Sequence, residues 1–153
     1  MDRLIVVLAT GFYSGKIPFA PGTWGSAFAL IPWYFCRGLS LANYLIVLGA
    51  LFVVGFLTAG SAEKIFDKPD PGSIVIDEIM GMFVALTLAP NHPVAWLLGF
   101  ILFRIFDVWK PFPVSWLDTH LHGGIGIMMD DVMAGIYALI CLQLIWLVIG
   151  RFF

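Results

Sequence analysis

The stretch GLSLANYLIVLGALFVVGFLTAGSA, residues 38–62, contains no charged side chain over 25 positions. A helix needs about 20 predominantly apolar residues to cross the hydrocarbon core of a bilayer. A second run, residues 132–150, has 19 uncharged positions near the end of the chain. These two segments predict membrane-spanning helices, and the rest of the chain is interpreted around them.

Composition supports an integral membrane protein. Of the 153 residues, 61% are hydrophobic and 12% are charged. Soluble domains carry about 25% charged residues. The mean hydropathy of +0.97 points the same way. A net charge of −2 gives no indication of nucleic-acid binding, and the length suits a single domain over residues 1–153.

A third uncharged run, residues 17–36, is less regular than the first two. Pro18, Pro21 and Gly22 interrupt its start. The helix that remains, about residues 23–35, is too short to span a bilayer independently. We therefore expect a segment that is re-entrant or leans on its neighbours.

The fourth uncharged run, residues 79–103, is divided by the sequence Pro90-Asn91-His92-Pro93. Two prolines around polar residues indicate a turn. Helices are therefore expected at about residues 79–89 and 94–109. The predicted fold is an all-α membrane bundle with about four or five membrane helices.

The positive charges predict which side each loop occupies. Alternating crossings place residues 1–16, 63–78 and 104–131 on one side, and Arg37 and Arg151 on the other. The first side holds six cations: Arg3, Lys16, Lys64, Lys68, Arg104 and Lys110. Because cytoplasmic loops carry the excess of Lys and Arg, this side is expected to face the cytoplasm.

Three acidic groups flank the apolar segments on that same side: Asp77-Glu78, Asp107 and Asp130-Asp131. Carboxylates close to hydrocarbon are unfavourable unless a partner compensates them. Helix N-termini and N-caps favour single acids and are the simpler explanation for each pair. Five carboxylates in three clusters instead favour a site for Mg²⁺, which binds hard oxygen ligands.

Arg104, Asp107 and Lys110 are spaced i, i+3, i+6 within FRIFDVWKPFP. This spacing places them close to one helical face, where they could form only a surface ladder of ion pairs. Aromatic and aliphatic residues fill the positions between them. We therefore favour a functional interpretation, with Asp107 on a metal ion and both cations facing a phosphate group.

The glycine-rich segment TGFYSGKIPFAPGTWGS, residues 10–26, could offer backbone N–H groups to a phosphate, with Lys16 adding charge. It is not a Walker A motif, and turn glycines are the simpler alternative. Segment 110–130 predicts a loop over the site, so that Asp130-Asp131 would open the last spanning helix. Ordinary loop or surface roles are expected for Glu63, Asp67, Lys68, Asp70, Asp118, His120 and His122.

Four blocks occur in the order expected of one family. They are TGFYSGKIPFAPGTWGS, KPDPGSIVIDE (residues 68–78), FRIFDVWKPFP (103–113) and GIGIMMDD (124–131). Together they resemble the phosphatidylglycerophosphatase A family. The resemblance implies a Mg²⁺-dependent phosphatase of the bacterial inner membrane. It would remove the terminal phosphate of phosphatidylglycerophosphate to give phosphatidylglycerol.

The residues and the resemblance together give a specific hypothesis. The expected metal ligands are Asp77, Glu78, Asp107, Asp130 and Asp131. The expected phosphate-binding residues are Lys16, Arg104 and Lys110. The expected catalytic residues are Asp77, Asp107, Asp131 and Lys110. Attack on phosphorus is assigned to a metal-activated water, and direct attack by an aspartate stays open.

One alternative is a cation transporter or channel component, because acidic residues within membranes also mark ion pathways. That role predicts carboxylates near the middle of the membrane and no need for Lys16 or Lys110. The expected partners are the lipid substrate and membrane lipid, with no nucleic acid and no obligate protein partner.

Overall fold

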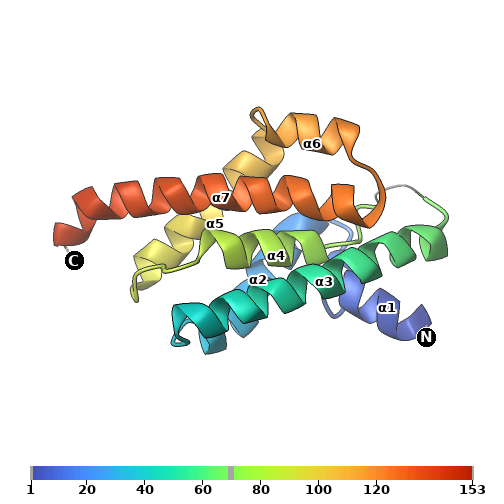
Figure 1. The fold of residues 1–153 in the computed structure, drawn as a ribbon, viewed down its shortest axis with the longest axis horizontal. Coiled ribbons are helices and arrows are strands. Elements are labelled where there is room, and N and C mark those ends of the chain that lie inside the picture. Colours follow the sequence, from blue (N-terminus) through green and yellow to red (C-terminus); the bar gives the residue numbers. More distant parts are fainter. Residues whose placement is uncertain (1, 69–70, 153) are drawn as a thin grey trace.

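A computed structural model describes residues 2–68 and 71–152. Over this part of the chain it is entirely helical, which confirms the predicted all-α class (Figure 1). The seven α-helices are α1 Asp2–Ala9, α2 Pro21–Cys36, α3 Leu41–Phe66, α4 Ile76–Ala85, α5 Pro93–Trp109, α6 Val114–His120 and α7 Gly123–Ile149. Short 3-10 turns are present at Ser14–Lys16 and Gly150–Phe152.

Two helices are long and apolar enough to cross a membrane, judged over the described residues. They are α3 and α7, the latter with its 3-10 extension to Phe152. Each contains most of one of the two uncharged runs that predicted spanning helices. The larger number of four or five membrane helices stays a prediction.

Helix α7 packs against α3, α4, α5 and α6. Figure 1 shows the short α4 lying between the long helices α3 and α7. Eight of the ten residues of α4 are buried. Because neighbours surround α4, its sequence is apolar almost throughout apart from the acidic pair in its first turn.

The connections gather at two ends of the bundle (Figure 1). The end of α3 and the starts of α4 and α7 lie towards one end, which we term the carboxylate end. The α2–α3 and α4–α5 connections lie at the other end with the C-terminus, and we term this the opposite end. The chain leaves α4 at Ala85 and enters α5 at Pro93, so the break between these helices falls where Pro90 and Pro93 predicted it.

The prediction that Asp130-Asp131 open the last helix is wrong. Helix α7 begins at Gly123, so these residues are its eighth and ninth. In the first turn of α7, position 124 requires glycine. A Cβ there would meet the carbonyl oxygen of Phe56 and lie 3.1 Å from the backbone nitrogen of Gly60. Small residues thus let α3 and α7 approach closely, and a sequence typical of a loop becomes helix.

Three other boundaries differ from those expected. Helix α2 starts at Pro21, because proline is well suited to the first helical position. Helix α4 covers residues 76–85 rather than 79–89, so the acidic pair lies inside its first turn. Segment 110–130 is not one loop, because α6 and the start of α7 occupy most of it.

Candidate active site

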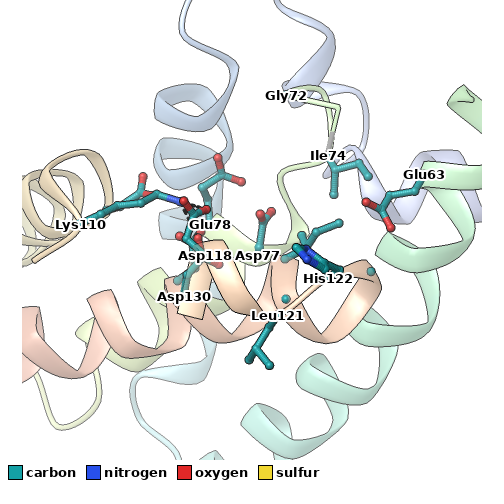
Figure 2. Close-up of a pocket in the computed structure, with 15 residues that line it drawn as sticks. Glu63, Gly72, Ile74, Asp77, Glu78, Lys110, Asp118, Leu121, His122 and Asp130 are labelled. Atoms are coloured by element: carbon teal, nitrogen blue, oxygen red, sulfur yellow. Dashed lines mark hydrogen bonds and ion pairs between the residues drawn. The ribbon is translucent and has the colours of Figure 1, made fainter. Parts of the chain in front are cut away.

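A cavity of about 270 Å³ lies at the carboxylate end, and Figure 2 shows its lining side chains converging from several elements. Seven of these side chains are carboxylates: Glu63, Asp77, Glu78, Asp107, Asp118, Asp130 and Asp131. Lys110 is the single Lys or Arg among the described lining residues. The cavity therefore combines strong negative charge with one local cation.

Three of the carboxylates can reach a common point. One ligand oxygen each from Asp77, Glu78 and Asp131 lies within 4.8 Å of the others. Asp77 and Glu78 come from the first turn of α4, whereas Asp131 comes from the third turn of α7. Packing between these two helices therefore creates the cluster.

Glycines bring α4 and α7 close enough for this meeting. A Cβ at Gly81 would lie 2.8 Å from the carbonyl oxygen of Asp131, and a Cβ at Gly135 would lie 2.5 Å from the carbonyl oxygen of Gly81. Both distances are shorter than van der Waals contact allows. Larger residues at either position would separate the two acidic elements.

The beginning of α2 approaches the same cluster. A Cβ at Gly22 would collide with the Glu78 carboxylate and lie 3.1 Å from Nη1 of Arg104. The hydroxyl of Ser26 donates to the carbonyl oxygen of Gly22 over 2.7 Å, and Arg104 Nη1 donates to that hydroxyl oxygen over 3.2 Å. The first two turns of α2 thus hold Arg104 beside Glu78.

Arg104 and Asp107 form an ion pair on α5, with 2.6 Å between Nη1 and Oδ2. Asp107 also interacts electrostatically with Glu78 and Asp131. It lines the cavity, but it is not one of the three carboxylates that share a common point. Its side chain therefore connects a cation to the acidic cluster.

Lys110 is the second cation of the site, and it lines the cavity. It follows the last turn of α5 with φ of +46°, so it leaves the helical face that its spacing suggested. Its Nζ lies 2.5 Å from Oδ1 of Asp118 and 2.7 Å from Oδ2 of Asp130. Burial lowers the pKa of Lys110, but the two hydrogen-bonded carboxylates outweigh burial and raise it above the ordinary value.

The oxygen atoms of the cluster fit a divalent cation. Four carboxylate oxygens are buried without a hydrogen-bond partner among the described residues: Asp77 Oδ1, Glu78 Oε2, Asp130 Oδ1 and Asp131 Oδ2. Unpaired buried charges of one sign are strongly unfavourable. Hard carboxylate oxygens in this number match the ligands of Mg²⁺ or Ca²⁺.

The structure places the glycine-rich segment beside the site but does not bring Lys16 into it. Lys16 is exposed, and its Nζ lies 5.0 Å from the centre of the Tyr13 ring. A Cβ at Gly15 or Gly25 would meet Ser73 or Val75, respectively. These glycines therefore pack the segment against the residues that precede Asp77, while phosphate binding by Lys16 stays a prediction.

Sequence reasoning missed three residues that line the cavity: Glu63, Asp118 and His122. Glu63 and Asp118 belong to α3 and α6, and His122 directly precedes α7. The alternating crossings had already placed Glu63 on the side of the other carboxylates, and the continuation of α3 to Phe66 brings it to the cavity. The expected surface residue Asp70 lies outside the described residues.

Comparison with known proteins gives consistent matches. A family model described as Phosphatidylglycerophosphatase A matches residues 7–146. The chain is 41% identical to Phosphatidylglycerophosphatase A of Escherichia coli K12, over 85% of this chain and 76% of the relative. It is 42% identical to Phosphatidylglycerophosphatase A of Haemophilus influenzae, over 89% of this chain and 85% of the relative.

A third bacterial relative carries a different name. A Bacteroides thetaiotaomicron protein, provisionally named a phosphatidylinositol-3-phosphatase, is 40% identical over 96% of both chains. All three names describe phosphatases that act on a phosphorylated lipid. No solved structure matches the chain.

Proposed function

The chain belongs to the phosphatidylglycerophosphatase A family, a family of phosphatases, and we propose that it hydrolyses the terminal phosphomonoester of phosphatidylglycerophosphate. The products would be phosphatidylglycerol and inorganic phosphate. The observation that supports this most directly is the partly buried cluster of Asp77, Glu78 and Asp131 beside two cations. Metal-assisted phosphoryl transfer uses this combination of metal ligands and positive charge.

The three clustered carboxylates would hold Mg²⁺, and Asp107 and Asp130 would complete or orient that set. Both flanking carboxylates line the cavity, and each is paired with a cation. When bound, Mg²⁺ would supply Lewis-acid polarisation of the phosphoryl group and make water a better nucleophile. All five acidic residues predicted from the sequence therefore take part in binding Mg²⁺ in this proposal.

Lys110 and Arg104 would bind the phosphoryl oxygens and neutralise the charge that develops on them. Lys110 is held by Asp130, which is buried, and by Asp118, whose side chain is 39% exposed. An entering phosphate dianion would replace Asp118 more easily than Asp130. Asp130 would then keep the Lys110 ammonium directed into the cavity.

We propose an orientation with the carboxylate end at the cytoplasmic side of the bacterial inner membrane. The excess of Lys and Arg in the segments at this end supports it. The two long apolar helices support membrane residence. A cation-transporting role for the carboxylates is not favoured, because the curated relatives are named as phosphatases.

The direct test is phosphate release from phosphatidylglycerophosphate in detergent micelles, with Mg²⁺ or with EDTA. We expect Mg²⁺-dependent release by the wild type. Asp131→Asn should lose at least about 100-fold in rate, because the cation that would stabilise the transition-state charge loses a ligand. Asp67→Asn is the matched control, because Asp67 is exposed and Asn tolerates its left-handed backbone.

Three results would contradict the proposal or part of it. Wild-type protein that stays folded with Mg²⁺ but releases no phosphate would reject the activity. Release from phosphatidylinositol 3-phosphate, but not from phosphatidylglycerophosphate, would instead transfer the assignment to the substrate named for the Bacteroides relative. Full activity in EDTA would reject the metal while leaving the phosphatase intact.

A further inference from the structure

A shallow apolar groove runs along the outside of α5, beside the start of α2. Its apolar and neutral lining residues are Thr23, Phe100, Ile101, Ile105, Val108 and Trp109. The exposed fractions of Ile101, Ile105 and Val108 are 44%, 48% and 73%, so the groove opens outward. It is separate from the carboxylate cavity, because the two sets of lining residues do not overlap.

One charged residue, Arg104, lies within this groove. Its side chain is 19% exposed, and its guanidinium bonds Asp107, which lines the carboxylate cavity. The ion pair between Arg104 and Asp107 thus joins the apolar groove to the carboxylate cavity. A molecule in the groove would therefore contact the Arg104 guanidinium, which could bind an anion.

The groove also continues into a longer apolar stripe. Leu97, Ile101, Ile105 and Val108 are exposed at helical spacing along α5. From Leu97 to Trp109 the stripe extends roughly 18 Å, at about 1.5 Å per residue. The exposed Trp109 lies at the end nearer the cavity, and tryptophan is typical of the membrane interface.

These features fit one class of occupant, which is a phospholipid. An apolar chain would cover the stripe, and an anionic headgroup would meet the guanidinium. We propose that an acyl chain of the lipid substrate lies in the α2–α5 groove while its phosphorylated headgroup passes Arg104 into the carboxylate cavity. This inference rests on the proposed phosphatase function and specifies entry sideways from the bilayer.

The test compares a groove variant with a matched control on two substrates. Ile101→Trp fills the groove, whereas Leu144→Trp places the same side chain at a 59% exposed position on α7, outside the groove. Each protein is assayed in mixed micelles with dioleoyl and with dihexanoyl phosphatidylglycerophosphate. The measured quantity is kcat/KM for each substrate.

We expect Ile101→Trp to lower kcat/KM for the dioleoyl substrate by about tenfold, as for the loss of contacts from roughly two methylene groups. The loss on the dihexanoyl substrate should be several-fold smaller, and Leu144→Trp should leave both values unchanged. Equal losses on both substrates would overturn the groove assignment. No wild-type activity on either substrate would instead reject the underlying phosphatase function.

A second measurement does not depend on activity. Phosphatidylglycerol with a photoreactive diazirine in its acyl chain should crosslink to residues 97–109 of wild-type protein, and less to Ile101→Trp. Crosslinks confined to other helices would overturn the proposal. So would a dimer that dissociates in Ile101→Trp without any change in dioleoyl kinetics, because this face would then bind a second copy of the chain.

Discussion

The two ends of the bundle differ in how completely their charged side chains are hydrogen-bonded. At the opposite end, Arg37 donates to the carbonyl oxygen of Tyr34 over 2.8 Å and to Oδ1 of Asn91 over 3.2 Å. Its guanidinium also lies 3.5 Å from the centre of the Tyr34 ring. Trp96 Nε1 and Gln143 Nε2 donate to the carbonyl oxygens of Pro90 and Leu88.

The carboxylate end is arranged differently, because four buried carboxylate oxygens have no partner among the described residues. Paired polar groups at the opposite end can stabilise the connections between helices. Unpaired like charges cannot stabilise the fold by themselves. The difference indicates that the carboxylate end is organised around something that binds there, at the expense of local stability.

The largest expected effect is that of Asp77→Asn. We expect at least about 100-fold slower phosphate release, together with loss of the rise in Tm that Mg²⁺ produces in the wild type. Without Mg²⁺ the variant should unfold no earlier than the wild type, because neutralisation removes repulsion within the cluster. Thermal unfolding in detergent, with and without Mg²⁺, measures the second effect.

Asp67→Asn again serves as the control and should keep both the activity and the Mg²⁺-induced rise in Tm. A rise of equal size in Asp77→Asn would show that the cation binds elsewhere. The contrast between the two ends would then lose its functional meaning.

The next largest effect is a loss of stability when the close packing of α3 and α7 at the carboxylate end is disturbed. Gly124→Ala would place a Cβ against the carbonyl oxygen of Phe56, and we expect a loss of about 1–3 kcal/mol in the free energy of unfolding. Gly49→Ala is the matched control, because nothing lies within 4 Å of a Cβ there. Denaturant unfolding in micelles compares the two, and equal stabilities would contradict this packing.

A smaller effect is expected at the opposite end. Arg37→Ala removes two hydrogen bonds and the contact with Tyr34, so it should destabilise the protein by about 1 kcal/mol. Because Arg37 is remote from the cavity, kcat and KM should stay within about twofold of the wild type. A large loss of activity at unchanged stability would mean that the two ends are coupled.

The smallest effect is that of Asp118→Asn. Weakening the partly exposed pair with Lys110 should release that ammonium to the substrate, lowering KM by no more than about fivefold while kcat stays constant. Asp2→Asn, at an exposed position on α1, is the control. A higher KM in Asp118→Asn would show that Asp118 positions Lys110 and does not compete with the phosphate.

The two longest helices, α3 and α7, could be predicted from the length of their uncharged segments. Residues 38–62 and 132–150 have too few polar groups for an exposed loop, and they became the cores of α3 and α7. The two prolines at 90 and 93 likewise predicted the break between α4 and α5. In each case a local property of the sequence decides the outcome.

The remaining features depend on contacts between distant segments. Gly123 and Gly124 indicate a loop when considered alone, but they form the first turn of α7, where Gly124 packs against Phe56 and Gly60. The five acidic candidates were visible in the sequence, whereas the pairing of Lys110 with Asp118 requires the fold of α6. Spacing along one helix cannot reveal such partners.

The position of Asp130 and Asp131 inside α7 also fixes how deep the acidic cluster can lie. Asp130 lies seven positions after Gly123, which is a rise of roughly 10 Å. Deleting one residue between them would shift the carboxylates by about 1.5 Å and also rotate them by about 100° around the helix axis. Depth and direction are therefore linked, and natural variation in this segment should be confined to substitutions, or to insertions and deletions of nearly whole turns.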